Sequence, residues 1–293
     1  MRSSVKALVP ACALALASGC GGAGGPTEGA AQRHEPAATC RLPGTPALVH
    51  RDGSAVQLVW ELEDAPVLWS DALPASEAFA AFRAEVARRV PDLDPRALLR
   101  RTYERDEPPA DEDDRKQRGN NRLIAEGEVG RLRPINCLEA ALVAYQAERV
   151  PMIERPTELH GIIVSRTGAA GTRHRVYVAA SDELFPPKPE QIVERVDADL
   201  AAGWHLAAHL HNHTWHLGEA GAASGAAAAT GDGVALPAPS TPDVHYYRAL
   251  RASRGLRRAL VTNGFHTVEI DAAELDALEA REVAGAAGLT PAR

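Results

Sequence analysis

The chain has 293 residues, which is enough for one sizeable domain or for two small ones. Its formal net charge is -7, and no run of Lys and Arg interleaved with aromatic residues is present. These features argue against nucleic acid as a partner, because binding to a phosphate backbone requires a basic surface.

The first twenty residues predict a secretory signal. Two basic residues precede an apolar run at 7–17, which is too short to span a bilayer. The run leads into Ala17-Ser18-Gly19-Cys20, which resembles the lipobox of bacterial lipoproteins, where the cysteine is lipidated. Ala17 stands where that pattern prefers Leu, so ordinary cleavage is the alternative. In both cases we expect an exported protein of the periplasm or cell envelope, with membrane contact only through a lipid on Cys20.

Residues 21–39 are rich in Gly, Ala, Pro and polar residues, and they predict a flexible tether. Cys40 and Cys137 then remain in an oxidising compartment, where a disulfide is one possibility. Two unrelated thiols are the other, because separation in sequence does not reveal the short Cα distance that a disulfide requires.

Residues 40–102 predict a small N-terminal α+β subdomain. Apolar runs within 47–62 flank Asp52-Gly53, a favoured pair for a tight hairpin turn. A helix is predicted at 76–90, where apolar residues follow one stripe between a Ser cap and a Pro stop. The highly charged segment 103–122 predicts an exposed linker or long loop.

Residues 123–285 predict a second domain of the α/β class, with a mixed sheet and flanking helices. Strands are predicted at 158–166, 173–180 and 204–213, with a hairpin at 259–270 that turns at Asn263-Gly264. Helices are predicted at 135–150, 189–202 and 240–253, and from Asp271 onward. The Ala- and Gly-rich stretch 218–238 lies inside an expected insertion at 214–239, which predicts a surface loop.

The strand at 204–213 carries histidines at alternate positions: His205, His209, His211 and His213. Side chains alternate between the faces of a strand, so we expect all four on one side of the sheet. Two imidazoles two residues apart can converge on one metal ion, and Zn²⁺ is the usual first-row candidate for such ligands. His211 and His213 are the preferred pair, and His209 with His211 is a competing register.

Asp243 is the expected third ligand. Two His and one carboxylate leave a fourth tetrahedral position for water, as in catalytic zinc sites. Glu158 would take the proton of that water, and Ser240 would donate a hydrogen bond to the oxyanion formed from a carbonyl. Ser240-x-x-Asp243 ahead of an apolar helix is also the pattern of a helix capping box, so both interpretations stay open.

The order of these motifs resembles the JAB1/MPN/Mov34 (JAMM) metalloprotease family, whose pattern is Glu, then His-x-His, then Ser-x-x-Asp. The resemblance covers about residues 151–278 and implies a cytidine-deaminase-like α/β sandwich that hydrolyses peptide or isopeptide bonds. By the same resemblance, His211, His213 and Asp243 match the zinc ligands, Glu158 the general acid/base and Ser240 the oxyanion donor. Thr214 stands where the family usually has Pro, and the insertion lengthens the gap before Ser240.

The sequence therefore predicts an exported zinc-dependent hydrolase that acts on a peptide or protein substrate. The main alternative is a non-catalytic member of the same fold that binds a partner or merely holds a metal. A third possibility is an interaction domain in which the low-complexity stretch is the working part.

Overall fold

The computed structural model describes residues 39–186, 189–217 and 235–278. The predicted signal peptide, all of the tether except its last residue, and residues 218–234 of the insertion lie outside this part. Within the described residues, no helix combines the length and apolar character needed to cross a membrane.

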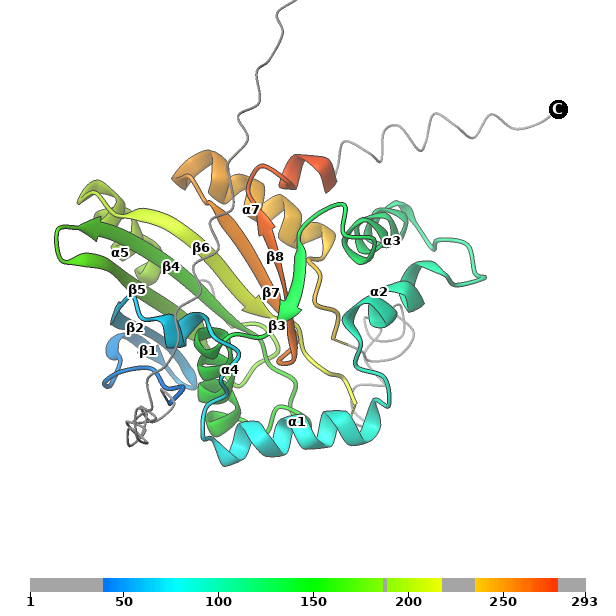
Figure 1. The fold of residues 1–293 in the computed structure, drawn as a ribbon, viewed down its shortest axis with the longest axis horizontal. Helices are drawn as coiled ribbons and strands as arrows, with labels where there is room; N and C mark the ends of the chain where they lie inside the picture. The colour runs from blue at the N-terminus through cyan, green and yellow to red at the C-terminus, as the bar shows by residue number, and fades with distance from the viewer. Residues whose placement is uncertain (1–38, 187–188, 218–234, 279–293) are drawn as a thin grey trace, which may run out of the picture. The chain divides into compact units, whose positions relative to one another are not determined.

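Eight strands of the described residues form one mixed sheet in the order β1-β2-β5-β4-β6-β7-β8-β3 (Figure 1). They are β1 (Ala47–Asp52), β2 (Ala55–Glu63), β3 (Arg131–Pro134), β4 (Leu159–Gly168), β5 (Gly171–Ala180), β6 (His205–Asn212), β7 (Arg258–Thr262) and β8 (His266–Asp271). Strands β6 and β7 run parallel, and the other neighbouring pairs are antiparallel. Strands predicted at 158–166, 173–180 and 204–213 are confirmed, as is the hairpin about Asn263-Gly264.

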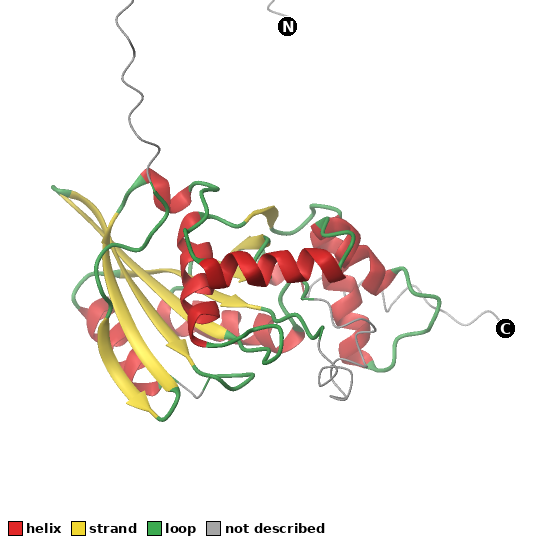
Figure 2. Cartoon of the chain, turned by 90° about the horizontal axis from the view of Figure 1, so that it is seen from below, coloured by secondary structure: helices red, strands yellow, loops and turns green. Residues whose placement is uncertain are grey.

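Helices cover both sides of the sheet (Figure 2). They are η1 (Pro66–Trp69), α1 (Glu77–Arg89), α2 (Pro95–Tyr103), α3 (Glu112–Ala125), α4 (Cys137–Arg149), α5 (Glu190–Ala201) and α7 (Thr241–Arg254). Buried residues of α3, α5 and α7 share a core with one face of β4, including Ile162. Residues of α4 share a second core with Ile163, on the other face. The predicted mixed α/β class is thus confirmed.

Residues 40–102 do not form a separate subdomain around their own sheet. Strand β2 pairs with β5 over eight residues, from Val56↔Ala180 to Glu63↔Arg173, so β1 and β2 extend the main sheet. The buried residues Leu58, Trp60 and Leu62 alternate along β2 and join the core beneath α4. A strand with one fully apolar face needs such a partner, and a two-stranded hairpin alone cannot supply it.

The charged segment 103–122 was expected as a linker or loop, and this prediction is wrong for its second half. Helix α3 begins at Glu112, and the Asp111 side chain accepts a hydrogen bond from Asp114 N at 2.8 Å. Acidic residues fill the first turn, where the partial positive charge of a helix N-terminus stabilises them. The acidic residues that have the composition of an exposed loop therefore cap and begin a helix.

A β-bulge in β6 divides its histidines between the two faces of the sheet. Ile163 pairs with Ala208 but Val164 pairs with Leu206, so Ala207 is an extra residue in β6. Because the alternation shifts there, His205 faces the side that carries Ser165, its partner on β4. The expectation that His205 shares a face with His209 and His211 is therefore wrong.

Cys40 and Cys137 form a disulfide with a Cα–Cα distance of 5.5 Å, which decides between the two possibilities that the sequence left open. The bond ties the N-terminal end of the described chain to the first residue of α4.

Both ends of the undescribed segment 218–234 are held by the turn that follows β7. The Trp215 indole donates a hydrogen bond to Asn263 O at 2.8 Å, and the Asn263 side chain donates to Ala235 O at 3.1 Å. Just before Trp215, His213 N donates to Thr262 O at 2.8 Å. The turn after β7 thus fixes the positions of Trp215, before this segment, and of Ala235, after it.

Candidate metal centre

His211 and His213 lie at the carboxyl end of β6 with their Nε2 atoms 3.0 Å apart. His213 Nδ1 donates to Leu236 O at 2.9 Å, because a carbonyl can only accept. His211 Nδ1 lies 2.7 Å from the Tyr247 hydroxyl. Each ring is thus held through Nδ1, which orients its Nε2 atom toward a common point, as in protein metal sites.

Asp243 completes the group from the first turn of α7. Its Oδ2 atom lies 3.4 Å from Nε2 of both His211 and His213. The same oxygen accepts hydrogen bonds from Ser240 N at 2.8 Å and from Ser240 Oγ at 2.6 Å. Ser240 and Asp243 therefore form the capping box, and this cap also fixes the carboxylate in front of the imidazoles.

The three side chains can hold a metal ion. Their ligand atoms all lie within 4.8 Å of one another. A tetrahedral ion with bonds of 2.0–2.2 Å separates its ligand atoms by about 3.3 to 3.6 Å, close to the triangle of 3.0, 3.4 and 3.4 Å found here. His211 is 1% exposed, whereas His213 and Asp243 are 19% and 22% exposed, so the centre opens on the side of His213 and Asp243.

Glu158 lies just before β4 and close to this centre. The pairing of β4 with β6 ends at His160 opposite His211, and the Glu158 carboxyl interacts electrostatically with His213, His211 and Asp243. Burial raises the pKa of the Glu158 carboxyl, an effect opposed by His213 and His211. The predicted residues therefore lie close together, where β4 begins and β6 ends: Glu158, His211, His213, Ser240 and Asp243.

Charge around the centre favours a cation. Burial alone would raise the pKa of Asp243, but His211 and His213 outweigh it and hold that pKa far below its ordinary value. Burial lowers the pKa of His213, whereas Asp243 and Glu158 raise it by more. Two carboxylates thus surround two imidazoles, and their negative charge attracts either protons or a metal ion.

Asn212, which lies between the two ligand histidines, connects them to Glu158. Its Oδ1 atom accepts a hydrogen bond from Leu159 N at 2.8 Å, and its Nδ2 atom donates to Thr157 O at 3.1 Å. These two backbone groups flank Glu158. Asn212 is buried, so its amide fixes the segment that carries Glu158 relative to β6.

His209 is not part of the metal-holding group, which disfavours the competing pair of His209 with His211. Its ring contacts those of His160 and Tyr246, with centroids 5.5 and 5.1 Å away. Burial lowers the pKa of His209 well below its ordinary value, so the imidazole is neutral. It forms a wall beside the centre, as expected for the preferred pair of ligands.

The supporting roles of Asn212 and Tyr247 were not predicted from the sequence. Tyr247 lies four residues after Asp243, and this helical spacing puts both on one side of α7. The spacing was therefore a usable signal for a residue that supports a ligand. Asn212 gave no comparable signal, because its hydrogen bonds depend on how two distant strands pair.

No protein-family model, curated protein or solved structure matches this chain.

Proposed function

We propose that the protein is a zinc-dependent hydrolase of peptide or isopeptide bonds, with a JAMM-like site on a JAB/MPN-like fold. One observation carries the proposal: His211, His213 and Asp243 converge on one point, and the Glu158 carboxyl lies within electrostatic reach of all three. A structural metal site needs no buried carboxylate beside its ligands, whereas a hydrolytic site does.

Zinc suits this set of two imidazole nitrogens and one carboxylate oxygen, since three protein ligands leave a position open. When bound, zinc would polarise the amide carbonyl and make water a stronger acid.

Glu158 is assigned the proton transfers. Its carboxylate would accept a proton from the attacking water and deliver that proton to the departing amine. A pKa raised by burial suits this role, because the carboxyl then binds the proton more readily than an exposed one. Asn212 keeps the backbone of Glu158 in place while the proton moves.

Ser240 has two parts in the proposal. Its backbone N–H and its hydroxyl both hold Asp243 in the structure. When the hydroxyl turns away from Asp243, it can donate to the developing oxyanion while the N–H group keeps the carboxylate in position.

We also propose that the protein works outside the cytoplasm, with Cys20 as its lipid anchor. The disulfide between Cys40 and Cys137 supports this location, because such bonds persist mainly in oxidising compartments.

Removal of the metal tests the proposal. The mature chain should bind one zinc ion, and a chelator should abolish cleavage of a panel of fluorogenic peptides and isopeptide-linked conjugates until zinc is restored. His216→Ala is the control, because His216 lies outside the metal-holding group and should leave zinc binding unchanged. Cleavage that persists without metal, or full zinc binding by a His211→Ala/His213→Ala variant, would contradict it.

Asn212→Ala should keep zinc but slow hydrolysis by about 10- to 100-fold, because small displacements of a catalytic group have effects of this size. Asn212→Asp retains the acceptor for Leu159 N but sets a buried carboxylate oxygen against Thr157 O, so its rate should lie at or below that of the Ala variant. Zinc content and kcat are the measurements. Equal rates for all three proteins would show that Asn212 does not position Glu158.

A further inference from the structure

The sheet face opposite the metal centre carries a polar depression next to η1 and β3. A cavity of about 290 Å³ is lined by residues that include Trp69, Arg131, Arg133 and Arg258. A second cavity of about 400 Å³ adjoins it and shares Ser165, His174, Ala207 and Arg258. We call the two together the arginine cleft.

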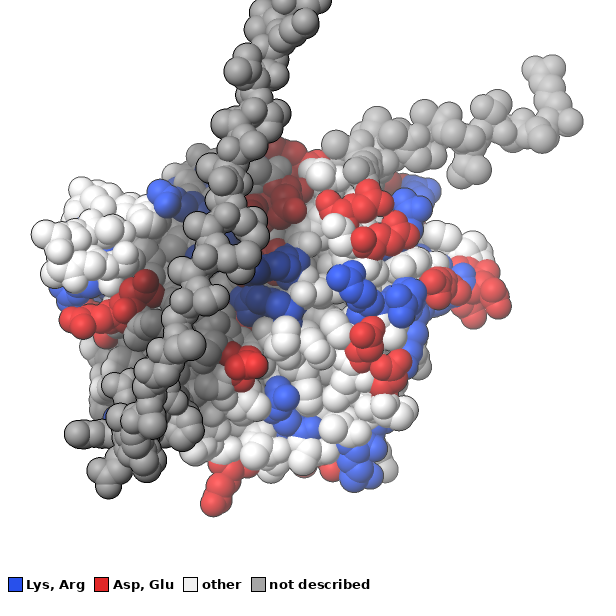
Figure 3. Space-filling view, viewed as in Figure 1, with Lys and Arg blue, Asp and Glu red and all other residues white. Residues whose placement is uncertain are grey.

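The arginine cleft has a surplus of positive charge although the chain is acidic overall. Four arginines line it (Arg131, Arg133, Arg257 and Arg258), against the two lining carboxylates of Glu269 and Asp271, and the buried Glu139 pairs with Arg133. The net charge of the whole chain is -7. Figure 3, which views the sheet from the side of α4, shows Lys and Arg side chains gathered near the middle of this face. Such a local surplus attracts an anion.

Two of these guanidinium groups keep most of their donors available. Arg131 and Arg258 each make one side-chain hydrogen bond within the described residues, at 3.1 Å to opposite oxygens of Glu269. Their side chains are 70% and 39% exposed. Each guanidinium has five N–H donors, so both can bind an oxyanion while Glu269 keeps them together.

An aromatic ring and a buried imidazole border the same space. Trp69 is 39% exposed, and its ring lies edge-to-face with His174, with centroids 5.5 Å apart. His174 is 8% exposed, and its Nδ1 atom lies 2.6 Å from Ser165 Oγ. Its Nε2 atom lies 3.4 Å from Asp64 Oδ1, so the imidazole is held from both ring nitrogens.

We propose that the arginine cleft binds a small ligand that carries a carboxylate or phosphate group. The oxyanion lies between Arg131 and Arg258, and the body of the ligand rests against Trp69 and the small residues of the floor. The ligand occupies the first of the two cavities, which Trp69, Arg131 and Arg258 line together, and its volume of about 290 Å³ fits a small molecule. This inference does not depend on the activity of the metal centre.

Fluorescence titration of Trp69 tests the proposal. All four tryptophans are described, and Trp60, Trp204 and Trp215 are buried, so an added ligand in the cleft should change the emission of Trp69. Three probes separate the chemistry: N-acetylleucine, its uncharged amide, and inorganic phosphate. We expect saturation by at least one anion with a dissociation constant near or below about 1 mM, and at least about tenfold weaker binding of the amide.

The double variant Arg131→Ala/Arg258→Ala should weaken anion binding at least about tenfold. The matched control Arg155→Ala/Arg173→Ala removes two exposed, carboxylate-paired arginines outside the cleft and should bind as the wild type does. Unchanged zinc content and melting temperature show that the variants fold. Saturation by N-acetylleucine assigns a carboxylate ligand, and saturation by phosphate alone assigns a phosphate ligand. Absence of anion saturation, or equal binding by the two double variants, overturns the proposal.

Discussion

Glu158→Gln is expected to abolish hydrolysis while leaving zinc bound. The substitution keeps the shape of the side chain but removes its ability to accept a proton, and general acid-base catalysis contributes about 10² to 10⁴ in rate. The three metal-holding side chains are unchanged, because Glu158 is not one of them. Two measurements check this expectation: kcat/KM on a cleavable peptide reports the loss of hydrolysis, and zinc affinity from competition with a chelator reports the retention of the metal.

Glu154→Gln provides the control for this substitution. Glu154 is exposed and lies four residues earlier in the chain, so its loss should leave both rate and metal affinity unchanged. If Glu158→Gln hydrolyses as fast as the wild type, Glu158 does not carry the proton transfers. If the variant loses its zinc, Glu158 is a ligand rather than a base.

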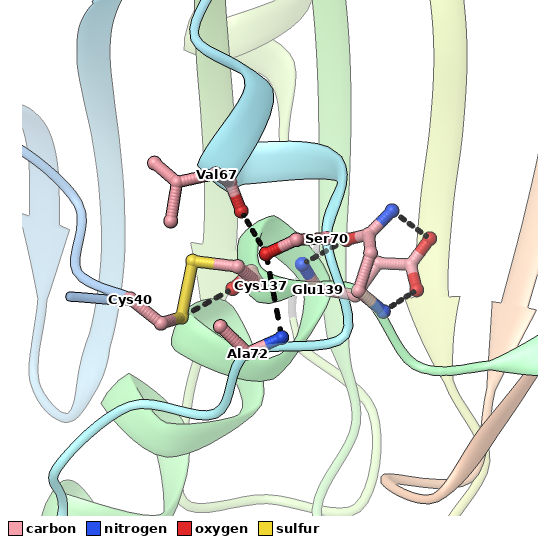
Figure 4. Close-up of a disulfide and its surroundings, with 7 residues drawn as sticks. Cys40, Val67, Ser70, Ala72, Cys137 and Glu139 are labelled. Atoms are coloured by element: carbon pink, nitrogen blue, oxygen red, sulfur yellow. Dashed lines mark hydrogen bonds between the residues drawn. A yellow bond between two sulfur atoms is a disulfide. The ribbon is translucent and has the colours of Figure 1, made fainter. Parts of the chain in front are cut away.

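Loss of the disulfide is expected to destabilise the fold without emptying the metal centre. The bond joins residues 97 apart, and closure of so long a loop restricts the unfolded chain strongly. Figure 4 shows Cys137 beside the segment that leads from η1, where Cys137 N donates to Ser70 O at 2.8 Å. We expect Cys40→Ser/Cys137→Ser to lower the free energy of unfolding by about 2 to 5 kcal/mol.

Guanidinium unfolding of the wild type with and without a reducing agent checks this expectation. The reduced wild type should unfold at the midpoint of the double Ser variant, and the reducing agent should not shift the variant further. Zinc content should be equal in all samples, because both cysteines lie outside the metal-holding group. Equal midpoints for oxidised and reduced wild type would show that the cross-link does not stabilise the fold.

Much of the metal centre was predictable because its signals are local. His211 and His213 are two positions apart on a strand, and Ser240 and Asp243 share one helical turn. The motif order then predicted that these two local units and Glu158 belong to one site. The pairing of His160 with His211 explains how Glu158, two residues before His160, comes to lie near His213, two residues after His211.

Features that depend on distant pairing were not predictable. The extra residue Ala207 moves His205 to the other face, and nothing in the alternation of β6 signals it. Strands β1 and β2 have the pattern of a local hairpin, and only the pairing of β2 with β5 makes them part of the main sheet. The prediction for 103–122 rested on the many charged residues of this segment. It was wrong for the second half because capping by Asp111 stabilises helix α3 there.

Asn263 binds both Trp215 and Ala235, so the geometry of the metal centre does not depend on how many residues lie between these two positions. The entropic cost of joining two points of a chain grows only slowly with the number of residues between them, by about 0.6 kcal/mol for each doubling. Insertions or deletions between Trp215 and Ala235 should therefore leave the distances among His211, His213 and Asp243 unchanged, and the protein can vary in length here without a redesign of its chemistry.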